Sequence, residues 1–312
     1  MQTCKSINIL TIKELCSLAG VSRSGYYNWL RSIESRKQRE LQDQVDFALI
    51  LKAYKYRSYA KGARGIYMRL LHTGIRMNVK KIRRLMKKYN LFCPIRKANP
   101  YRRMAKAIRT NAVADNTLNR EFRMHGPRKV LLTDITYIPY DKKFAYLSVI
   151  KDAYTAQVLS YVLSDSLELD FVLETVNKLL KNHSSTLEAD IMIHSDQGCH
   201  YTSIKFRELL QNEGIRQSMS RRGNCWDNAP QESFFGHMKD ELTDQQKHWK
   251  TFSDVQQSID DWMDYYNNDR YQWNLEKLSP NEYYNYIITG INPLDKETYN
   301  YYIPFVKEKE KQ

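Results

Sequence analysis

Two aspartates lie within or directly after runs of apolar, β-branched residues that predict buried strands. Asp134 falls inside VLLTDITYI, and Asp196 ends IMIHSD with Gly198 close behind it. A carboxylate in a buried strand either becomes protonated or pairs with a cation, because a low dielectric penalises a lone charge. Taken alone, Asp134 is better explained as a strand-edge aspartate whose side chain faces water. Their chemistry therefore depends on whether other charged groups lie beside them.

A third acid and a base occur together in RRGNCWDNAPQESFFGHMKDEL. Glu232 follows Pro230 by two residues, so it is predicted in the first turn of a helix whose apolar residues pack against the sheet. Lys239 is seven residues further on, which is about two helical turns and hence the same face. Such a pair occurs by chance in many helices. Two strand-borne aspartates and one helix-borne glutamate can nevertheless converge on one point above a sheet.

The elements that must position these acids lie in residues 128–288. Three strands with short connections, typical of an antiparallel meander, are predicted in KVLLTDITYIPY, KFAYLSVIKDA and QVLSYVLS. They are followed by helix LELDFVLETVNKLLKNH, strand DIMIHSD, helix TSIKFRELLQNEG, strand IRQSMS and the helix near Pro230. This order predicts an α/β fold with a mixed five-stranded sheet. Chemistry in such sheets usually lies at the carboxyl ends of strands.

Two short helices with a tight turn are predicted near the start, in TIKELCSLAG and VSRSGYYNWL. Thr11 and Ser22 are the expected N-caps, and Gly20 supplies the turn. The shared core would be formed by Leu15, Leu18, Val21, Tyr26 and Leu30. The pattern is that of a helix-turn-helix over 1–35, and the groups that its second helix presents to a major groove would be Arg23, Ser24 and Asn28. A small helical pair without a DNA-binding role would give the same pattern.

Residues 36–93 are predicted to form a basic, all-α region. Asn78 would cap NVKKIRRLMKKYNL, whose apolar stripe comprises Val79, Ile82, Leu85 and Met86. The basic side chains around the stripe are candidate phosphate contacts, namely Lys80, Lys81, Arg83, Arg84, Lys87 and Lys88. The basic, proline-containing residues 94–127 are predicted to be a linker, and 289–312 a C-terminal tail.

The positive charge of the chain is concentrated at its start. Residues 1–120 contain 27 Lys and Arg against six Asp and Glu, a net of +21, whereas residues 121–312 contain 22 against 29, a net of −7. A solvated helix surface explains most individual charge runs. An excess that persists over this length favours a polyanionic partner, because each neutralised phosphate releases counterions.

Several classes of protein are disfavoured by the composition. No apolar run approaches the roughly 20 residues that span a bilayer, and the start lacks a signal-peptide core, so we expect a cytoplasmic protein without a membrane partner. The five cysteines include no C-x-x-C pair, so neither a disulfide framework nor a thiolate zinc site is indicated. A tyrosine recombinase is disfavoured because no single nucleophile stands out among 23 tyrosines.

The acids and their surroundings resemble a known family. Asp134, Asp196 and Glu232, the last two separated by 35 residues, with Lys239 behind them, look like the Asp-Asp-35-Glu signature of retroviral-integrase-type transposases. The segments LLTDITYIP, IHSDQGCHYTS and SMSRRGNCWDNAPQESFFGHMKDEL resemble the OrfB-type transposases of the insertion-sequence-three family, as do KGARGIYMRLL, NVKKIRRLMKKYNL and YYNNDRYQWNLEKLSPNEYY. The similarity spans about residues 10–285. Unlike in retroviral integrases, no His/His/Cys/Cys zinc module precedes the core.

The resemblance implies an RNase-H-like catalytic core that binds two Mg²⁺ ions, with Mn²⁺ able to substitute. Asp134, Asp196 and Glu232 would be both metal ligands and catalytic residues, and Lys239 would grip a DNA phosphate. Carboxylate oxygens suit hard cations, and two ions about 3.5–4 Å apart can activate the attacking oxygen and stabilise the leaving one. Hydrolysis would free a 3′-hydroxyl at the end of the element, and that hydroxyl would attack a second phosphodiester.

Other residues near the acids have less specific patterns. His194 and His200 flank Asp196 but are poorly spaced for chelation around a turn, so structural or outer-shell roles are favoured. Residues 226–228 would order the loop before Glu232 or touch DNA. The aromatic segment DWMDYYNNDRYQW is expected to pack as a helix.

The favoured interpretation is a transposase that cleaves and transfers DNA strands at the ends of its mobile element. Its expected partners are terminal inverted repeats, target DNA, further copies of the chain as a homo-multimer, and an OrfA protein from the upstream frame, separate or fused by frameshift. We expect it in the bacterial cytoplasm, at the nucleoid. One alternative is a non-enzymatic helix-turn-helix regulator with a degenerate core, which the intact acidic trio disfavours. Another is an RNase-H-type nuclease that only hydrolyses.

Overall fold

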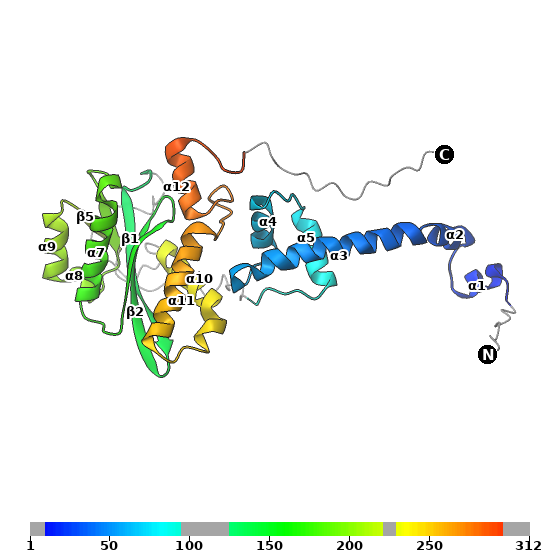
Figure 1. Cartoon of the computed structure of the whole chain (residues 1–312), viewed down its shortest axis with the longest axis horizontal. Coiled ribbons are helices and arrows are strands. Elements are labelled where there is room, and N and C mark those ends of the chain that lie inside the picture. Colours follow the sequence, from blue (N-terminus) through cyan, green and yellow to red (C-terminus); the bar gives the residue numbers. More distant parts are fainter. Residues whose placement is uncertain (1–9, 95–124, 221–228, 296–312) are drawn as a thin grey trace.

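The computed structural model describes residues 10–94, 125–220 and 229–295. Figure 1 shows a pair of short helices at the far end of a long helix, then a helical unit, then a sheet with helices on both faces. Most of the predicted linker 94–127, and residues 226–228, lie outside the described residues. Within these ranges, no helix combines the length and apolar character that a membrane span requires.

The predicted pair near the start is present as α1 (Ile12–Leu18) and α2 (Arg23–Arg31). Thr11 forms a reciprocal capping box at the start of α1, and the Ser22 side chain accepts a hydrogen bond from the third backbone N–H of α2. Gly20 has a positive φ of 64°, a conformation that glycine adopts without strain. The caps and the turn were therefore predicted correctly.

The shared core predicted for this helical pair is wrong. Leu15, Leu18 and Val21 are 40%, 75% and 52% exposed, and the other two predicted core residues are only half-buried. Cys16 is the buried residue of α1. The physical reason is size, because helices of seven and nine residues offer too little area to cover each other's apolar faces.

A helical unit is formed by α3 (Ile33–Lys55), α4 (Ala63–His72) and α5 (Val79–Lys88), with a short 3₁₀ turn η1 (Tyr56–Ser58) after α3. Its core contains Ile50, Ile66, Ile82, Leu85 and Met86. The predicted stripe of α5 is confirmed, although Val79 is only half-buried. Asn78 caps α5 as predicted, accepting the Lys80 N–H at 2.8 Å.

The predicted mixed five-stranded sheet is confirmed. Its strands are β1 (Val130–Tyr140), β2 (Lys143–Asp152), β3 (Val158–Ser164), β4 (Met192–Ser195) and β5 (Arg216–Met219). Their order in the sheet is β3-β2-β1-β4-β5. The first three strands form an antiparallel meander, whereas β4 pairs parallel to β1 and β5 parallel to β4.

Helices cover both faces of the sheet (Figure 1). One face packs on α7 (Asp170–His183), α8 (Cys199–Thr202) and α9 (Ile204–Asn212), with the 3₁₀ turn η2 (Ser184–Thr186) after α7. The other face packs on α10 (Ala229–Gln246) and α11 (Phe252–Asn268), and α12 (Pro280–Thr289) follows. The aromatic segment predicted to pack as a helix does so as far as Asn268, with Trp262, Tyr265 and Tyr266 buried in this second core, whereas Tyr271 and Trp273 follow the helix.

Polar and aromatic contacts join the helical unit to the α/β unit. Asp269, just after α11, accepts hydrogen bonds from Tyr56 Oη at 3.0 Å and pairs with Arg57 Nη2 at 2.9 Å. On α4, His72 stacks on Tyr271 with ring centroids 3.5 Å apart. These contacts orient α4, and with it α5, relative to the sheet.

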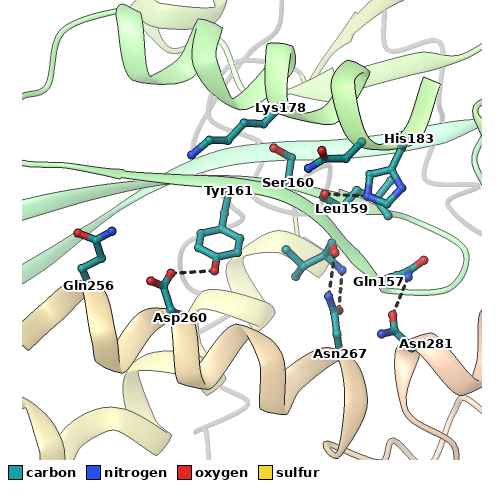
Figure 2. Close-up of a pocket in the computed structure, with 12 residues that line it drawn as sticks. Gln157, Leu159, Ser160, Tyr161, Lys178, His183, Gln256, Asp260, Asn267 and Asn281 are labelled. Atoms are coloured by element: carbon teal, nitrogen blue, oxygen red, sulfur yellow. Dashed lines mark hydrogen bonds between the residues drawn. The ribbon is translucent and has the colours of Figure 1, made fainter.

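The free edge of the sheet, along β3, lies in a polar hollow of about 570 Å³ between α7 and α11. Figure 2 shows Asn267 reaching from α11, where its side-chain amide donates to Val158 O and accepts from Val158 N–H, both at 2.9 Å. Tyr161 donates to Asp260 beside it at 2.8 Å. Asn267 thus covers part of an edge that would otherwise be open to pairing. None of the three predicted catalytic acids lines this hollow.

Candidate active site

Adjacent strand ends hold the two aspartates. The parallel register of β1 and β4 pairs Leu132 with His194. Two residues further along each strand are Asp134, inside β1, and Asp196, directly after β4. The predicted positions of both acids are therefore confirmed, and both lie where parallel neighbours bring side chains to the same level.

Asp134 points to the face of the sheet that α10 covers. It lies directly opposite Val149 of β2, and cross-strand partners share a face. Val149 belongs to the core formed with Phe234, Phe235 and Met238 of α10. The helix that carries Glu232 therefore covers the face on which Asp134 lies.

The turn after β4 fixes the Asp196 carboxylate. Its Oδ1 accepts a hydrogen bond from the Gly198 N–H at 2.9 Å. A Cβ added at Gly198 would lie 2.9 Å from the same oxygen, closer than real Cβ atoms come. The glycine that follows this acid in the sequence therefore leaves the space that the carboxylate occupies.

Gly198→Ala is expected to displace the Asp196 carboxylate and to reduce strand joining without unfolding the protein. Because the clash is with the tip of one side chain, we expect a loss of roughly 10–100-fold, the range for disturbing a group that orients a metal ligand. Joining of labelled DNA ends and thermal unfolding would be measured together. Gly62→Ala at the start of α4, where φ is −76° and an added Cβ meets nothing within 4 Å, is the matched control. Equal joining rates for the two variants would contradict the role given to Gly198.

A buried tyrosine, Tyr201 of α8, lies beside the strand that carries Asp134. It is 1% exposed, and its Oη lies 3.4 Å from Thr133 Oγ1, the hydroxyl that precedes Asp134. Burial raises the pKa of Tyr201 well above its ordinary value, and the charges of Asp134 and Asp196 raise it further. The phenol is therefore neutral, and the charges of both aspartates act on it.

The first turn of α10 carries Glu232, as predicted, and its side chain is exposed. Lys239 lies two turns further along the same helix. Loss of hydration lowers the pKa of Lys239, and the charge of Asp134 acts in the opposite direction. The charges of Lys239 and Asp134 therefore act on each other, and Lys239 shares a helix with Glu232.

The three acids do not form a metal-binding cluster in the described residues. In the described parts of the chain, no group of three or more His, Cys, Asp and Glu side chains is close enough to hold a metal ion. The donor chemistry nevertheless fits a hard divalent cation, since all three groups are carboxylates. Their role as ligands stays a prediction.

The two histidines near Asp196 have protein partners. His194 is fully buried, and its Nδ1 lies 3.0 Å from Ser218 Oγ on β5. His200 Nε2 lies 2.8 Å from the Leu167 carbonyl oxygen. These contacts agree with the structural roles predicted for both.

The residues predicted to contact DNA fall into two groups. Arg23, Ser24 and Asn28 are exposed on α2, and Lys80, Arg83 and Lys87 are exposed on α5. On α5, exposed positions three and four residues apart lie on one face. Their contact with DNA stays a prediction.

Lys81 and Arg84 have partners within the protein. Lys81 forms an ion pair with Asp46 of α3, and the Arg84 guanidinium donates to both oxygens of Asp43 at 2.7 and 2.8 Å. Hydrogen bonding to Arg84 holds the pKa of Asp43 well below its usual range. These two basic residues therefore join α5 to α3, a role that the sequence analysis missed.

Sequence reasoning also missed Tyr201 and Lys151. Lys151 lies in the apolar run SVIKDA of β2, and it is buried on the same face as Asp134. The rule that singled out Asp134, a charge inside a predicted buried strand, would have found Lys151. No comparable signal marks Tyr201, because an aromatic residue on a short helix is ordinarily part of a core.

Family models match most of the described chain. A model described as an integrase core domain matches residues 124–225, and a second model of that description matches residues 213–280. A model described as an HTH-like domain matches residues 40–99. The latter match covers most of α3 and all of α4 and α5, which the sequence analysis assigned to a basic helical region, rather than the helix-turn-helix predicted over 1–35.

Relatives align with more than two thirds of the chain. A 31 kDa protein of insertion element IS600 from Shigella sonnei is 32% identical over 273 residues, covering 85% of this chain and 96% of that protein. The transposase for insertion sequence element IS904 from Lactococcus lactis is 32% identical over 232 residues, covering 72% and 87%. A transposase-like protein from Haemophilus influenzae is 35% identical over 216 residues, covering 68% and 95%.

A solved structure, the catalytic core domain of BIV integrase, aligns over 52% of this chain and 98% of that chain at 18% identity with a TM-score of 0.41. This likeness is too distant to add to the assignment. The family models and the relatives are sufficient for it. The chain therefore belongs to the integrase-core transposases of insertion sequences, of the OrfB type, which cleave and transfer DNA strands.

Proposed function

We propose that Asp134, Asp196 and Glu232 together bind two Mg²⁺ ions, or Mn²⁺ in their place, and catalyse DNA cleavage and 3′-hydroxyl transfer at the ends of a mobile element. One observation carries the proposal. Two carboxylates lie at adjacent strand ends, and the helix over the Asp134 face carries Glu232 in its first turn. Bound metal would activate the attacking oxygen and stabilise the leaving one in an in-line displacement.

The protein's own groups would prepare this reaction. Asp196 is oriented by the Gly198 N–H, and Asp134 Oδ1 accepts the Ile135 N–H at 2.8 Å. Lys239, within reach of Asp134, would contact the phosphate beside the reacting bond. Glu232 would move toward the aspartates when metal and DNA bind, since the described residues do not hold all three acids in one cluster.

Strand joining is expected to require a divalent cation. Labelled DNA carrying the element ends would be incubated with a target DNA, with Mg²⁺, with Mn²⁺ or with a chelator. We expect joined product in both metals and none with the chelator, while end binding persists. Joining that continues in excess chelator would contradict the metal assignment. Shortened strands with no joined product would instead support the nuclease that only hydrolyses.

We propose that α5 presents the main DNA-binding surface. It is the second helix of the α4–turn–α5 pair, whose turn contains Gly74 at φ 78°, and this pair lies within the HTH-like match. Second helices of helix-turn-helix units enter the major groove. Lys80, Arg83 and Lys87 would contact DNA there, and Arg23, Ser24 and Asn28 of α2 would extend the contact. Lys81 and Arg84 would hold α5 against α3 through their ion pairs with Asp46 and Asp43.

Replacing Lys80, Arg83 and Lys87 together by alanine is expected to weaken binding to all DNA sequences and to flatten its salt dependence. Each lost phosphate contact should reduce the slope of log K against log salt by about 1. Binding would be measured by fluorescence anisotropy over a series of salt concentrations. The control replaces three exposed lysines of the α/β unit, Lys142, Lys143 and Lys181. An equal effect in the control would contradict a specific role for α5.

The domain limits and the partners follow from the same proposal. Residues 1–35 would be an accessory helix-turn-helix, 36–93 the basic DNA-binding region and 128–288 the catalytic core, with 94–127 as linker and 289–312 as tail. Copies of the chain would assemble on the terminal inverted repeats and the target DNA. An OrfA protein from the upstream frame, separate or fused by frameshift, would join them.

A further inference from the structure

A buried lysine lies inside β2, on the face of the sheet that carries Asp134. Lys151 is 4% exposed and lies opposite Leu132 of β1. Val149, the preceding β2 residue on the same face, lies opposite Asp134. Removing an ammonium group from water costs free energy unless polar partners compensate. A lysine at such a position is therefore informative, because an apolar residue would fill the strand without that cost.

The Lys151 ammonium contacts the beginning of α10. Its Nζ donates a hydrogen bond to the Pro230 carbonyl oxygen at 2.9 Å and lies 4.9 Å from the centroid of the Phe234 ring. Pro230 is two residues before Glu232, and Phe234 is two residues after it. Lys151 thus contacts the helix on both sides of the predicted third metal ligand.

The same turn contains a polar group without a partner among the described residues. Gln231 is fully buried, and in the described part of the chain neither its side-chain nitrogen nor its side-chain oxygen has a hydrogen-bond partner. A buried amide that makes no hydrogen bond gives the turn no directional contact with the sheet. The directed bond from Lys151 to Pro230 is therefore important for where this turn lies.

We propose that Lys151 is a positioning residue that, through Pro230, sets the first turn of α10 and so the approach of Glu232 to Asp134 and Asp196. The inference rests on the proposed function, because it takes Glu232 as the third metal ligand. The four-carbon stem of lysine is flexible, so the bond can follow a small movement of the turn when Glu232 closes on metal.

The test compares Lys151→Met with Lys178→Met in the full chain. Methionine keeps most of the apolar stem and removes the charge and the donors, and Lys178 is a solvent-exposed lysine of α7 on the opposite face. Mn²⁺ affinity would be measured by electron paramagnetic resonance titration, alongside the Mg²⁺ dependence of strand joining, end binding and thermal unfolding. We expect Lys151→Met to weaken Mn²⁺ binding and to raise the Mg²⁺ requirement by roughly 10–100-fold, with end binding unchanged. Lys178→Met should match the unmodified protein.

Unchanged Mn²⁺ affinity and Mg²⁺ requirement in a folded Lys151→Met variant would overturn the inference. If that variant does not fold, Lys151→Arg carries the test, because the bulkier guanidinium keeps the charge but shifts the turn. An unaltered metal dependence in Lys151→Arg would then overturn it. Glu232→Gln, measured in parallel, separates failure of the proposed function from failure of this inference. If Glu232→Gln still joins strands, the proposed function is wrong. If Glu232→Gln loses joining while Lys151→Met behaves like the unmodified protein, only the positioning role of Lys151 is rejected.

Discussion

Asp134→Asn is expected to abolish strand joining and to leave binding to the element ends intact. Asparagine has nearly the same shape but no charge, and hard divalent cations prefer carboxylate oxygens. The loss should exceed the roughly 10–100-fold that follows from removing an outer-shell partner of a metal ligand. DNA binding should persist because the exposed basic residues proposed to contact DNA, apart from Lys239 on α10, lie on α5 and α2. Joining of labelled ends and a gel-shift assay on the same DNA would measure the two properties.

Asp190→Asn is the matched control for this variant. Asp190 lies six residues before Asp196 and forms a surface ion pair with Arg216 at 2.8 Å, so its substitution should leave joining unchanged. Loss of end binding in Asp134→Asn with joining preserved would contradict the assignment of Asp134. A similar loss of joining in both variants would show that the assay detects surface charge rather than the proposed site.

Arg270→Met is expected to lower the free energy of unfolding by about 3–5 kcal/mol, the range for removing one partner of a buried ion pair. Arg270 follows α11, and its Nε and Nη2 donate to Glu241 Oε1 of α10 at 3.0 and 2.9 Å. The Glu241 side chain is 5% exposed, and Trp262 Nε1 also donates to it at 3.0 Å. Burial lowers the pKa of Arg270, but Glu241 outweighs it and raises the pKa above its ordinary value. Without the arginine, Glu241 would remain buried and uncompensated.

Urea unfolding would measure this loss. The control is Lys247→Met, which removes an exposed pair with Asp244 and should change stability by less than about 1 kcal/mol. The double variant Glu241→Gln/Arg270→Met should recover part of the stability, because the two groups interact directly. A change in Arg270→Met no larger than that of the control would show that the Glu241 pair does not hold α10 against α11.

The sheet and its helices could be predicted because their sequence patterns are local. In the strands of 128–288, apolar residues alternate with polar ones or form continuous runs, and in the helices apolar residues recur every three to four positions. Each pattern therefore indicates which side of its element is buried. Asp134 and Asp196 stood out for the same reason, since a charge interrupts an apolar run. The position of Glu232 in the first turn of a helix was predicted from a helix start near Pro230, and α10 begins at Ala229 in the structure.

Features that depend on contacts between distant residues could not be predicted. The pairs of Lys81 with Asp46 and of Arg84 with Asp43 join α5 to α3, and nothing within the α5 sequence indicates which basic side chains face a neighbour. The core predicted for the helix-turn-helix was wrong because the spacing of apolar residues identifies the apolar face of a helix. The spacing does not show whether another element covers that face. Tyr201 was missed because its contact with Thr133, next to Asp134, forms only when α8 packs against the sheet.

A crystal structure of the protein with Mn²⁺ and an element-end DNA would show whether the three acids share two metal ions. Anomalous scattering would locate the metal independently of the protein. We expect two peaks about 3.5–4 Å apart, held by oxygens of Asp134, Asp196 and Glu232 after movement of the first turn of α10. Peaks bound elsewhere, or at the aspartates with Glu232 still facing solvent, would contradict the shared metal site.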